Sequence, residues 1–187
     1  MKMDADLPKK TEEQPLAGHY SFAVYAVMCL RMKTVYVWGG MGEILSPESL
    51  RIKAEEYPER FTPEKIQSLL EKADRNTRMF DCSGLIKGFL MSGFHGFRYN
   101  PEKDLNCFEL LCQAAVSGPM NTLPELEGIC LYMPDHVGIY MGNGNVIEAT
   151  DSPKFGNGVV QTKLSDREWT QWFCCPWINY SDDMTGK

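Results

Sequence analysis

The chain has 187 residues, a net charge of −6 and an isoelectric point near 5.1. This length is sufficient for one domain with a sizeable core, and 43% hydrophobic with 24% charged residues is usual for a globular protein. The acidic balance and the lack of a basic stripe argue against a nucleic-acid partner. No apolar run approaches the roughly 18 residues of a membrane-spanning helix, so we expect no membrane insertion.

The first 14 residues are polar and are predicted to form a flexible tail, followed by a single folded domain over residues 15–187. They lack the apolar core of a signal peptide. If the protein acts outside the cell, we therefore expect cytoplasmic synthesis with release by lysis or non-classical export, or a leader that has been removed.

The seven cysteines are odd in number and contain no C-x-x-C pair, which argues against a zinc site of that type. No metal or organic cofactor is expected. Most cysteines stand in apolar surroundings and are interpreted as buried free thiols, a usage that suggests synthesis in a reducing compartment. Cys107 and Cys112, in a helix predicted over 105–117, are interpreted as structural.

In chain order, a helix is predicted over Gly18–Lys33, followed by a short aromatic strand at 35–38 that ends in a Gly-Gly turn. Residues 41–79 are interpreted as a helical insertion. It contains two short helices, 47–57 and 63–73, each preceded by a capping Ser or Thr and beginning with Pro. We interpret their charged residues as a solvated face, with a lid or wall over an active site as the alternative.

Phe80–Phe89 predicts a tight turn that leads into a buried helix ending near Ser92, with Cys82 in its first turn. A thiol at this position faces the positive end of the helix dipole and several unpaired N–H groups. Both features favour the thiolate, which is the reactive form of cysteine. Cys82 is therefore a candidate nucleophile.

The second half predicts strands at 128–133 and 159–162, separated by a hairpin of His136–Tyr140 and Asn145–Ala149 and a loop at 151–158. His136 and Glu148 fall on the same face of the two hairpin strands. A histidine beside a carboxylate is the usual partner of a cysteine nucleophile, although His136 alone would more often be structural. His95, in a loop at 94–101, is a weaker candidate.

Three segments carry a family resemblance: Tyr36-Val-Trp-Gly-Gly, Asp81-Cys-Ser-Gly-Leu and His136-Val-Gly-Ile-Tyr-Met-Gly-Asn-Gly, in this order. The pattern covers roughly residues 34–178 and resembles the NlpC-type family of bacterial cell-wall cysteine peptidases. The resemblance implies an α+β, papain-like domain, with helices packed on an antiparallel sheet and the nucleophile at the start of a central helix.

The same resemblance implies a role for each matching residue. Cys82 would be the nucleophile and His136 the base, whereas Tyr36, Asp81 and Ser83 would shape the pocket for the residue before the cut. The substrate implied is a peptidoglycan stem peptide, typically cut between D-glutamate and the following diamino acid, so the setting would be a bacterial cell wall.

The sequence departs from the family pattern in two ways. Glu148 stands where the family commonly has His, Asn or Gln, although the related CHAP-type amidases and endopeptidases use Glu there, and a carboxylate binds an imidazolium strongly. The insertion 41–79 is also long. The alternatives left open are an N-acetylmuramoyl-L-alanine amidase or acyl transferase on the same scaffold, and an inactive module that binds wall peptides. The oligomeric state is open as well.

Overall fold

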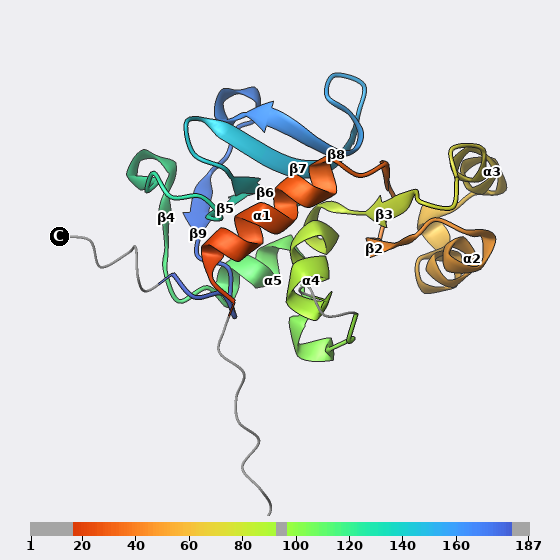
Figure 1. The fold of residues 1–187 in the computed structure, drawn as a ribbon, viewed down its shortest axis with the longest axis horizontal. Coiled ribbons are helices and arrows are strands. Elements are labelled where there is room, and N and C mark those ends of the chain that lie inside the picture. The colour runs from red at the N-terminus through yellow and green to blue at the C-terminus, as the bar shows by residue number, and fades with distance from the viewer. Residues whose placement is uncertain (1–16, 93–96, 181–187) are drawn as a thin grey trace, which may run out of the picture.

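Residues 17–92 and 97–180 form an α+β fold, and they are the part of the chain that this computed structural model describes (Figure 1). The helices are α1 His19–Leu30, α2 Pro47–Glu56, α3 Pro63–Glu71, α4 Cys82–Ser92 and α5 Cys107–Cys112. The strands are β1 Thr34–Tyr36, β2 Met41–Ile44, β3 Arg78–Phe80, β4 Ser117–Pro119, β5 Cys130–Met133, β6 His136–Tyr140, β7 Asn145–Ser152, β8 Gly156–Lys163 and β9 Gln171–Phe173. The predicted tail and His95 lie outside the described residues.

The larger sheet is six-stranded and antiparallel, with the strand order β4-β9-β5-β6-β7-β8. α1 and α4 lie against the same face of this sheet (Figure 1). Their buried side chains, such as Phe22 and Ile86, join those of the central strands, such as Ile139 and Ile147, in one core. This core fixes α4, which begins at Cys82, against the strands that carry His136 and Glu148.

The smaller sheet has the order β1-β3-β2, in which β1 and β3 are parallel and β2 is antiparallel to β3. Two side-chain hydrogen bonds join it to the larger sheet. The amide of Tyr36 donates to Asn157 Oδ1 at 2.8 Å, and the amide of Val159 donates to Thr34 Oγ1 at 2.9 Å. The end of β1 is thereby fixed beside β8, and with it Tyr36.

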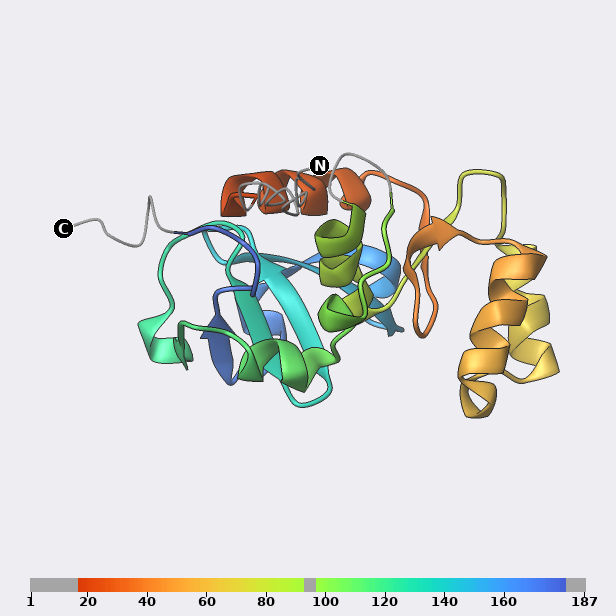
Figure 2. The ribbon, with the colours of Figure 1, turned by 90° about the horizontal axis from the view of Figure 1, so that it is seen from below.

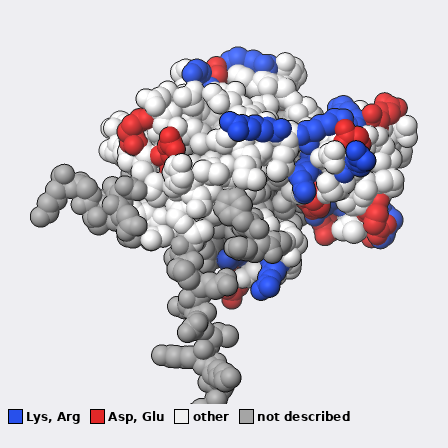
Figure 3. All heavy atoms as spheres, viewed as in Figure 1, with Lys and Arg blue, Asp and Glu red and all other residues white. Residues whose placement is uncertain are grey.

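Helices α2 and α3 project from the smaller sheet as a helical pair (Figure 2). They have a core of their own, in which Leu50, Phe61 and Leu69 pack on Val37 and Met79 of the sheet side. The outer surface of the pair is charged, whereas the face over α1 is largely uncharged (Figure 3). A border between this pair and the active site stays a prediction.

Several predicted elements differ from the structure. Residues 41–79 are not helical throughout, because they begin with β2 and end with the first residues of β3. The helix predicted over 105–117 ends at Cys112, and Ser117–Pro119 pairs with β9 instead. The loop predicted at 151–158 is largely strand, since β7 continues to Ser152 and β8 starts at Gly156. None of the described helices is long and apolar enough to cross a membrane.

Candidate active site

The start of α4 is held by the Asp81 carboxylate, which lies between the end of β3 and Cys82. Its Oδ1 accepts from the Gly84 amide at 2.5 Å and from Ser83 Oγ at 3.1 Å, and its Oδ2 accepts from the Gly39 amide at 2.7 Å. These bonds fix the first turn of α4 to the turn that follows Trp38. Cys82 is therefore placed at a rigid helix start, and the Ser83 amide donates to its sulfur.

The same turn lies directly against α4. A β-carbon built on Gly84 would lie 1.8 Å from the Gly40 carbonyl oxygen, and one built on Gly88 would lie 2.7 Å from the Met41 carbonyl oxygen. Only glycine allows the backbones to approach this closely. Gly84 of the Asp81-Cys-Ser-Gly segment thus allows α4 to pack directly against the Gly39-Gly40 turn.

His136 and Glu148 meet across the β6–β7 hairpin. His136 Nε2 lies 2.5 Å from Glu148 Oε2, and the Glu148 side chain is fully buried. The pairs Ile139–Ile147 and Tyr140–Val146 set the register, and extending it places Glu148 opposite Gly138, diagonal to His136. With Nε2 facing Glu148, Nδ1 is the ring nitrogen left for the Cys82 sulfur, with which His136 forms a hydrogen bond.

Glu148 is surrounded by further donors. Thr162 Oγ1 donates to Oε1 at 2.6 Å, and Arg167 donates through Nε to Oε1 at 3.2 Å and through Nη2 to Oε2 at 2.8 Å. Burial by itself would raise the pKa of Glu148, but the bonds from His136, Arg167 and Thr162 outweigh it and lower that pKa to about 2. The carboxylate is therefore ionised at neutral pH.

Trp169 covers the outer side of the histidine. Its ring stacks on His136 with 5.7 Å between the ring centroids and 19° between the planes. A β-carbon on Gly138 would lie 2.9 Å from the Trp169 ring, so this glycine makes room for the indole. The stacking restricts the rotation of the imidazole, whose side chain is only 14% exposed.

The charge state of the site follows from these contacts. A hydrogen bond from Cys107 lowers the pKa of Cys82; burial opposes this, but the bond to His136 lowers the pKa further, to about 4. Burial would lower the pKa of His136, yet its bonds to Cys82 and Glu148 raise it to about 9. At neutral pH the site therefore holds a Cys82 thiolate beside a His136 imidazolium.

The residues predicted to bind substrate also lie at this site. The Tyr36 side chain interacts with Cys82, and burial together with the negative charge of Cys82 raises the pKa of Tyr36 well above its ordinary value. Burial and the same charge raise the pKa of Asp81 to about 6. The Ser83 hydroxyl donates its hydrogen bond to the Asp81 carboxylate. Substrate binding by these three residues stays a prediction, and for Asp81 the internal bonds are already numerous.

Four residues at the site were missed by sequence reasoning, namely Cys107, Thr162, Arg167 and Trp169. Cys107 was interpreted as structural, but its sulfur lies 3.4 Å from that of Cys82. A signal for its position was available, since Asn106 is a good helix cap and begins α5 at Cys107. Nothing in the sequence marks Arg167, because it follows β8 in a short turn whose direction only the fold sets.

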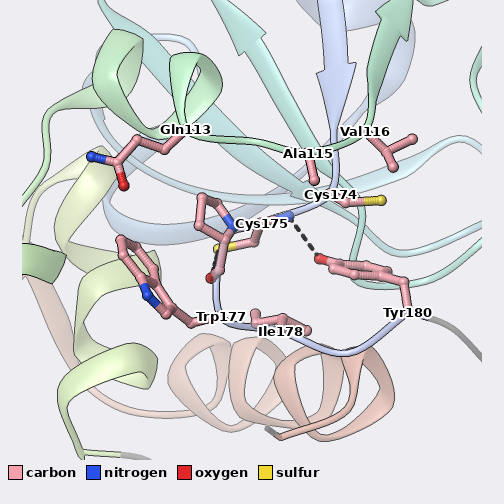
Figure 4. A pocket seen from close by; sticks show the side chains of 9 residues that line it. Gln113, Ala115, Val116, Cys174, Cys175, Trp177, Ile178 and Tyr180 are labelled. Carbon is pink, nitrogen blue, oxygen red and sulfur yellow. Dashed lines mark hydrogen bonds between the residues drawn. The ribbon is translucent and has the colours of Figure 1, made fainter.

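Two cavities of the described residues lie apart from this chemistry. One, of about 470 Å³, is between the end of α5 and the C-terminal segment, where the Cys175 amide donates to the Tyr180 hydroxyl at 3.1 Å (Figure 4). The other, of about 520 Å³, is lined by residues of α1, β2, β3 and α4. Cys82, His136 and Glu148 line neither of them. Among the described residues, no group of three or more His, Cys, Asp or Glu side chains is arranged to hold a metal ion.

Comparison with known proteins gives structural similarity only. No protein-family model and no curated protein matches the sequence. The P60 domain of antigen MAP1204 from M. avium subspecies paratuberculosis is 21% identical, with a TM-score of 0.48 over 87% of this chain and 98% of that chain. The NlpC/p60 domain of the peptidoglycan hydrolase SagA is 15% identical, with a TM-score of 0.44 over 84% and 99%. The peptidoglycan hydrolase RipB from Mycobacterium tuberculosis is 19% identical, with a TM-score of 0.49 over 95% and 75%.

These identities and TM-scores do not assign an activity to this chain. The chemistry of its own site is the basis for its function. There, a thiolate contacts an imidazolium, which in turn contacts a buried carboxylate.

Proposed function

We propose that this protein is a cysteine peptidase that hydrolyses an amide bond through an acyl-enzyme on Cys82. The observation that carries the proposal is the chain of contacts from the Cys82 sulfur to His136 and on to Glu148, with 2.5 Å between Nε2 and Oε2. A nucleophile, a base and a group that orients the base are the parts that this reaction requires.

Each part has a defined task. The Cys82 thiolate attacks the carbonyl carbon, and a backbone N–H group at the start of α4 stabilises the oxyanion. The His136 imidazolium donates its proton to the leaving amine, which departs and leaves a thioester on Cys82. Neutral His136 then takes a proton from water, whose oxygen attacks the thioester and frees the thiolate. Glu148 holds the ring in place and stabilises its charged form.

The substrate that we propose is a peptidoglycan stem peptide, cut between D-glutamate and the following diamino acid in a bacterial cell wall. Support comes from the three sequence segments around Tyr36, Cys82 and His136, which resemble the NlpC-type family in content and in order. The structure adds the contact of the Tyr36 hydroxyl with Cys82. A polar group beside the nucleophile is suited to position a substrate backbone at the reacting sulfur.

Digestion of purified peptidoglycan, followed by mass spectrometry of the soluble fragments, tests this proposal. A cut after D-glutamate leaves a new amino group on the diamino acid, whereas an amidase would release the whole stem peptide from muramic acid. An acyl transferase would give products joined to an added amine. Cys82→Ala should release no fragments; fragments equal to those of the parent would overturn the role of Cys82.

The alternative of a binding module is distinguished by a second measurement. Iodoacetamide labelling reports whether Cys82 is reactive, independently of any substrate. A chain that binds wall peptides, releases no fragments and leaves Cys82 unlabelled would be a binding module and would overturn the proposed activity.

A further inference from the structure

A second thiol lies beside the nucleophile. The Cys107 sulfur is 3.4 Å from the Cys82 sulfur, and both side chains are more than nine-tenths buried. Cys107 is the first residue of α5, where the Asn106 side chain accepts from the Phe108 and Glu109 amides and Glu109 bonds back to the Asn106 amide. This capping box fixes the start of α5, and so the second thiol is as firmly placed as the first.

The two thiols are in different protonation states. Cys107 donates a hydrogen bond to Cys82, and this bond, burial and the charge of Cys82 raise the pKa of Cys107 far above its ordinary value. Cys82 is a thiolate and Cys107 a neutral thiol. A thiolate is the form that peroxides oxidise, and a neighbouring thiol is what converts the resulting sulfenic acid to a disulfide.

We propose that Cys107 is a resolving thiol, which forms a reversible disulfide with Cys82 when a hydroperoxide oxidises the nucleophile. The disulfide would make the enzyme inactive until a reductant restores both thiols. It would also prevent the irreversible oxidation of Cys82 to sulfinic or sulfonic acid. The inference depends on the reactivity of Cys82 but not on the substrate or the bond proposed above.

The two steps balance with hydrogen peroxide as the oxidant. The Cys82 thiolate attacks one peroxide oxygen, the O–O bond breaks, and sulfenic acid and hydroxide form. The Cys107 sulfur then loses its proton and attacks the Cys82 sulfur, the S–O bond breaks, and the departing hydroxide leaves with that proton as water. The two sulfurs together give two electrons, and the peroxide yields one water and one hydroxide. That hydroxide takes a proton from the solvent and becomes the second water.

The geometry requires only a small movement. A disulfide bond is about 2.05 Å long, so the two sulfurs must approach by about 1.4 Å from their separation of 3.4 Å. The chain offers one competing pair, since the buried thiols of Cys130 and Cys175 also interact with each other. An experiment can therefore identify which cysteine forms a disulfide with Cys82.

The test treats the reduced full chain with a small excess of hydrogen peroxide at neutral pH, blocks the remaining thiols with iodoacetamide, and maps peptides without reduction. The expected result is a loss of two hydrogen atoms, a linked peptide that contains Cys82 and Cys107, and loss of Cys82 labelling. Dithiothreitol should restore nearly all of the labelling. Two results for the wild-type chain would overturn the proposal. In one, Cys82 gains oxygen atoms and no linked peptide forms; in the other, only Cys130 and Cys175 are linked.

Two variants sharpen the result. In Cys107→Ser, peroxide should add two or three oxygen atoms to Cys82, and dithiothreitol should restore less than about a tenth of the labelling. Cys112→Ser is the matched control, because Cys112 is exposed and lies on the same helix; it should behave like the parent. Recovery in Cys107→Ser equal to that of the parent would overturn the proposal. Circular dichroism checks that the variant folds; if it does not, the linkage map of the wild-type chain decides.

Discussion

Glu148 carries a negative charge in the interior of the larger sheet, with no exposed surface. A buried carboxylate that lacks partners would take up a proton. Here the partners come from three places: the β6 histidine, Thr162 on β8 and Arg167 beyond it. The chemistry of one residue thus depends on side chains that never contact the substrate.

Substitution of Glu148 should separate its orienting role from its charge. Glu148→Ala should lower kcat/KM by about 10⁴-fold, as removal of the orienting carboxylate does in serine triads, whereas Glu148→Gln should retain part of the activity. The carboxylate raises the pKa of His136, so Glu148→Gln should lower it. Because activity requires the imidazolium, activity should then be lost at a lower pH than in the parent. Parent-like rates and pH profile in Glu148→Ala would make Glu148 a structural strand residue.

Arg167 should act as a positioning residue through Glu148. Arg167→Met removes two charge-assisted bonds and leaves Glu148 buried with less compensation, which should cost about 3 kcal/mol of unfolding free energy. The pKa of Glu148 should rise from about 2 but stay below neutral, so the carboxylate remains ionised. Loss of the nearby Arg167 charge should raise the pKa of His136, so activity should persist to a higher pH than in the parent. Urea unfolding and a kcat/KM–pH profile measure both effects. Arg51→Met, on exposed α2, is the control and should change neither; a stability loss without any change of the pH profile would make Arg167 purely structural.

At the scale of elements, the contact between α4 and the Gly39-Gly40 turn is the closest approach at the site. Gly84→Ala should force α4 away from the Gly40 carbonyl, since its β-carbon would overlap that oxygen. We expect a loss of about 3 kcal/mol of unfolding free energy and slower iodoacetamide labelling of Cys82. Gly18→Ala is the matched control, because nothing lies within 4 Å of its β-carbon and its φ of −76° suits any residue. Equal unfolding midpoints for the two variants would contradict this packing role.

The elements also show what sequence patterns can predict. The helix at Cys82 was predicted correctly to Ser92, because its apolar side chains have helical spacing over its whole length. The prediction that the helix of α5 continues to residue 117 was wrong, because Ser117–Pro119 forms a strand that pairs with β9. The β7–β8 hairpin ends were missed because they are polar; Gly156 and Gly158 adopt φ of 108° and 112° there, and Asn157 binds Tyr36 on a distant strand.

At the scale of the whole molecule, the candidate site combines residues from both sheets and from α4. Sequence motifs predicted the candidate nucleophile, base and orienting carboxylate, and these three residues do meet. Motifs could not predict Arg167, Trp169 or the placement of Cys107, because no short spacing relates them to the motif residues. Their positions depend on the packing of α5 and of the segment after β8 against the larger sheet.

The ion pair predicts a broad bell-shaped pH dependence. Activity should rise as Cys82 ionises near its pKa of about 4 and fall as His136 loses its proton near its pKa of about 9. Iodoacetamide should therefore label Cys82 already at pH 5. Cys29 and Cys174 are the internal references, because burial raises the pKa of each to about 11, and neither should react at that pH. Labelling of Cys82 that begins only above about pH 8, as for a free thiol, would contradict the ion pair.

The bridge between Gly18 and Asn179 has a consequence for the topology of the chain. The Asn179 amide donates to the Ala17 carbonyl at 2.9 Å and the His19 amide to the Asn179 carbonyl at 3.0 Å, so the described polypeptide is nearly a closed ring. A ring can be opened elsewhere, and proteins whose ends are adjacent often tolerate circular permutation.

A permuted chain that starts at Tyr99 and joins Lys187 to Met1 would place His136 before Cys82. We expect Cys82 in it to be labelled at pH 5 as fast as in the parent, because the ring and its packing are unchanged. A permutant opened between Ile86 and Lys87, in the middle of buried α4, is the control and should lose this reactivity. Equal loss in both would show that the fold requires the natural chain order. If the permutant that starts at Tyr99 keeps its reactivity, the site does not require the nucleophile to precede the base along the sequence.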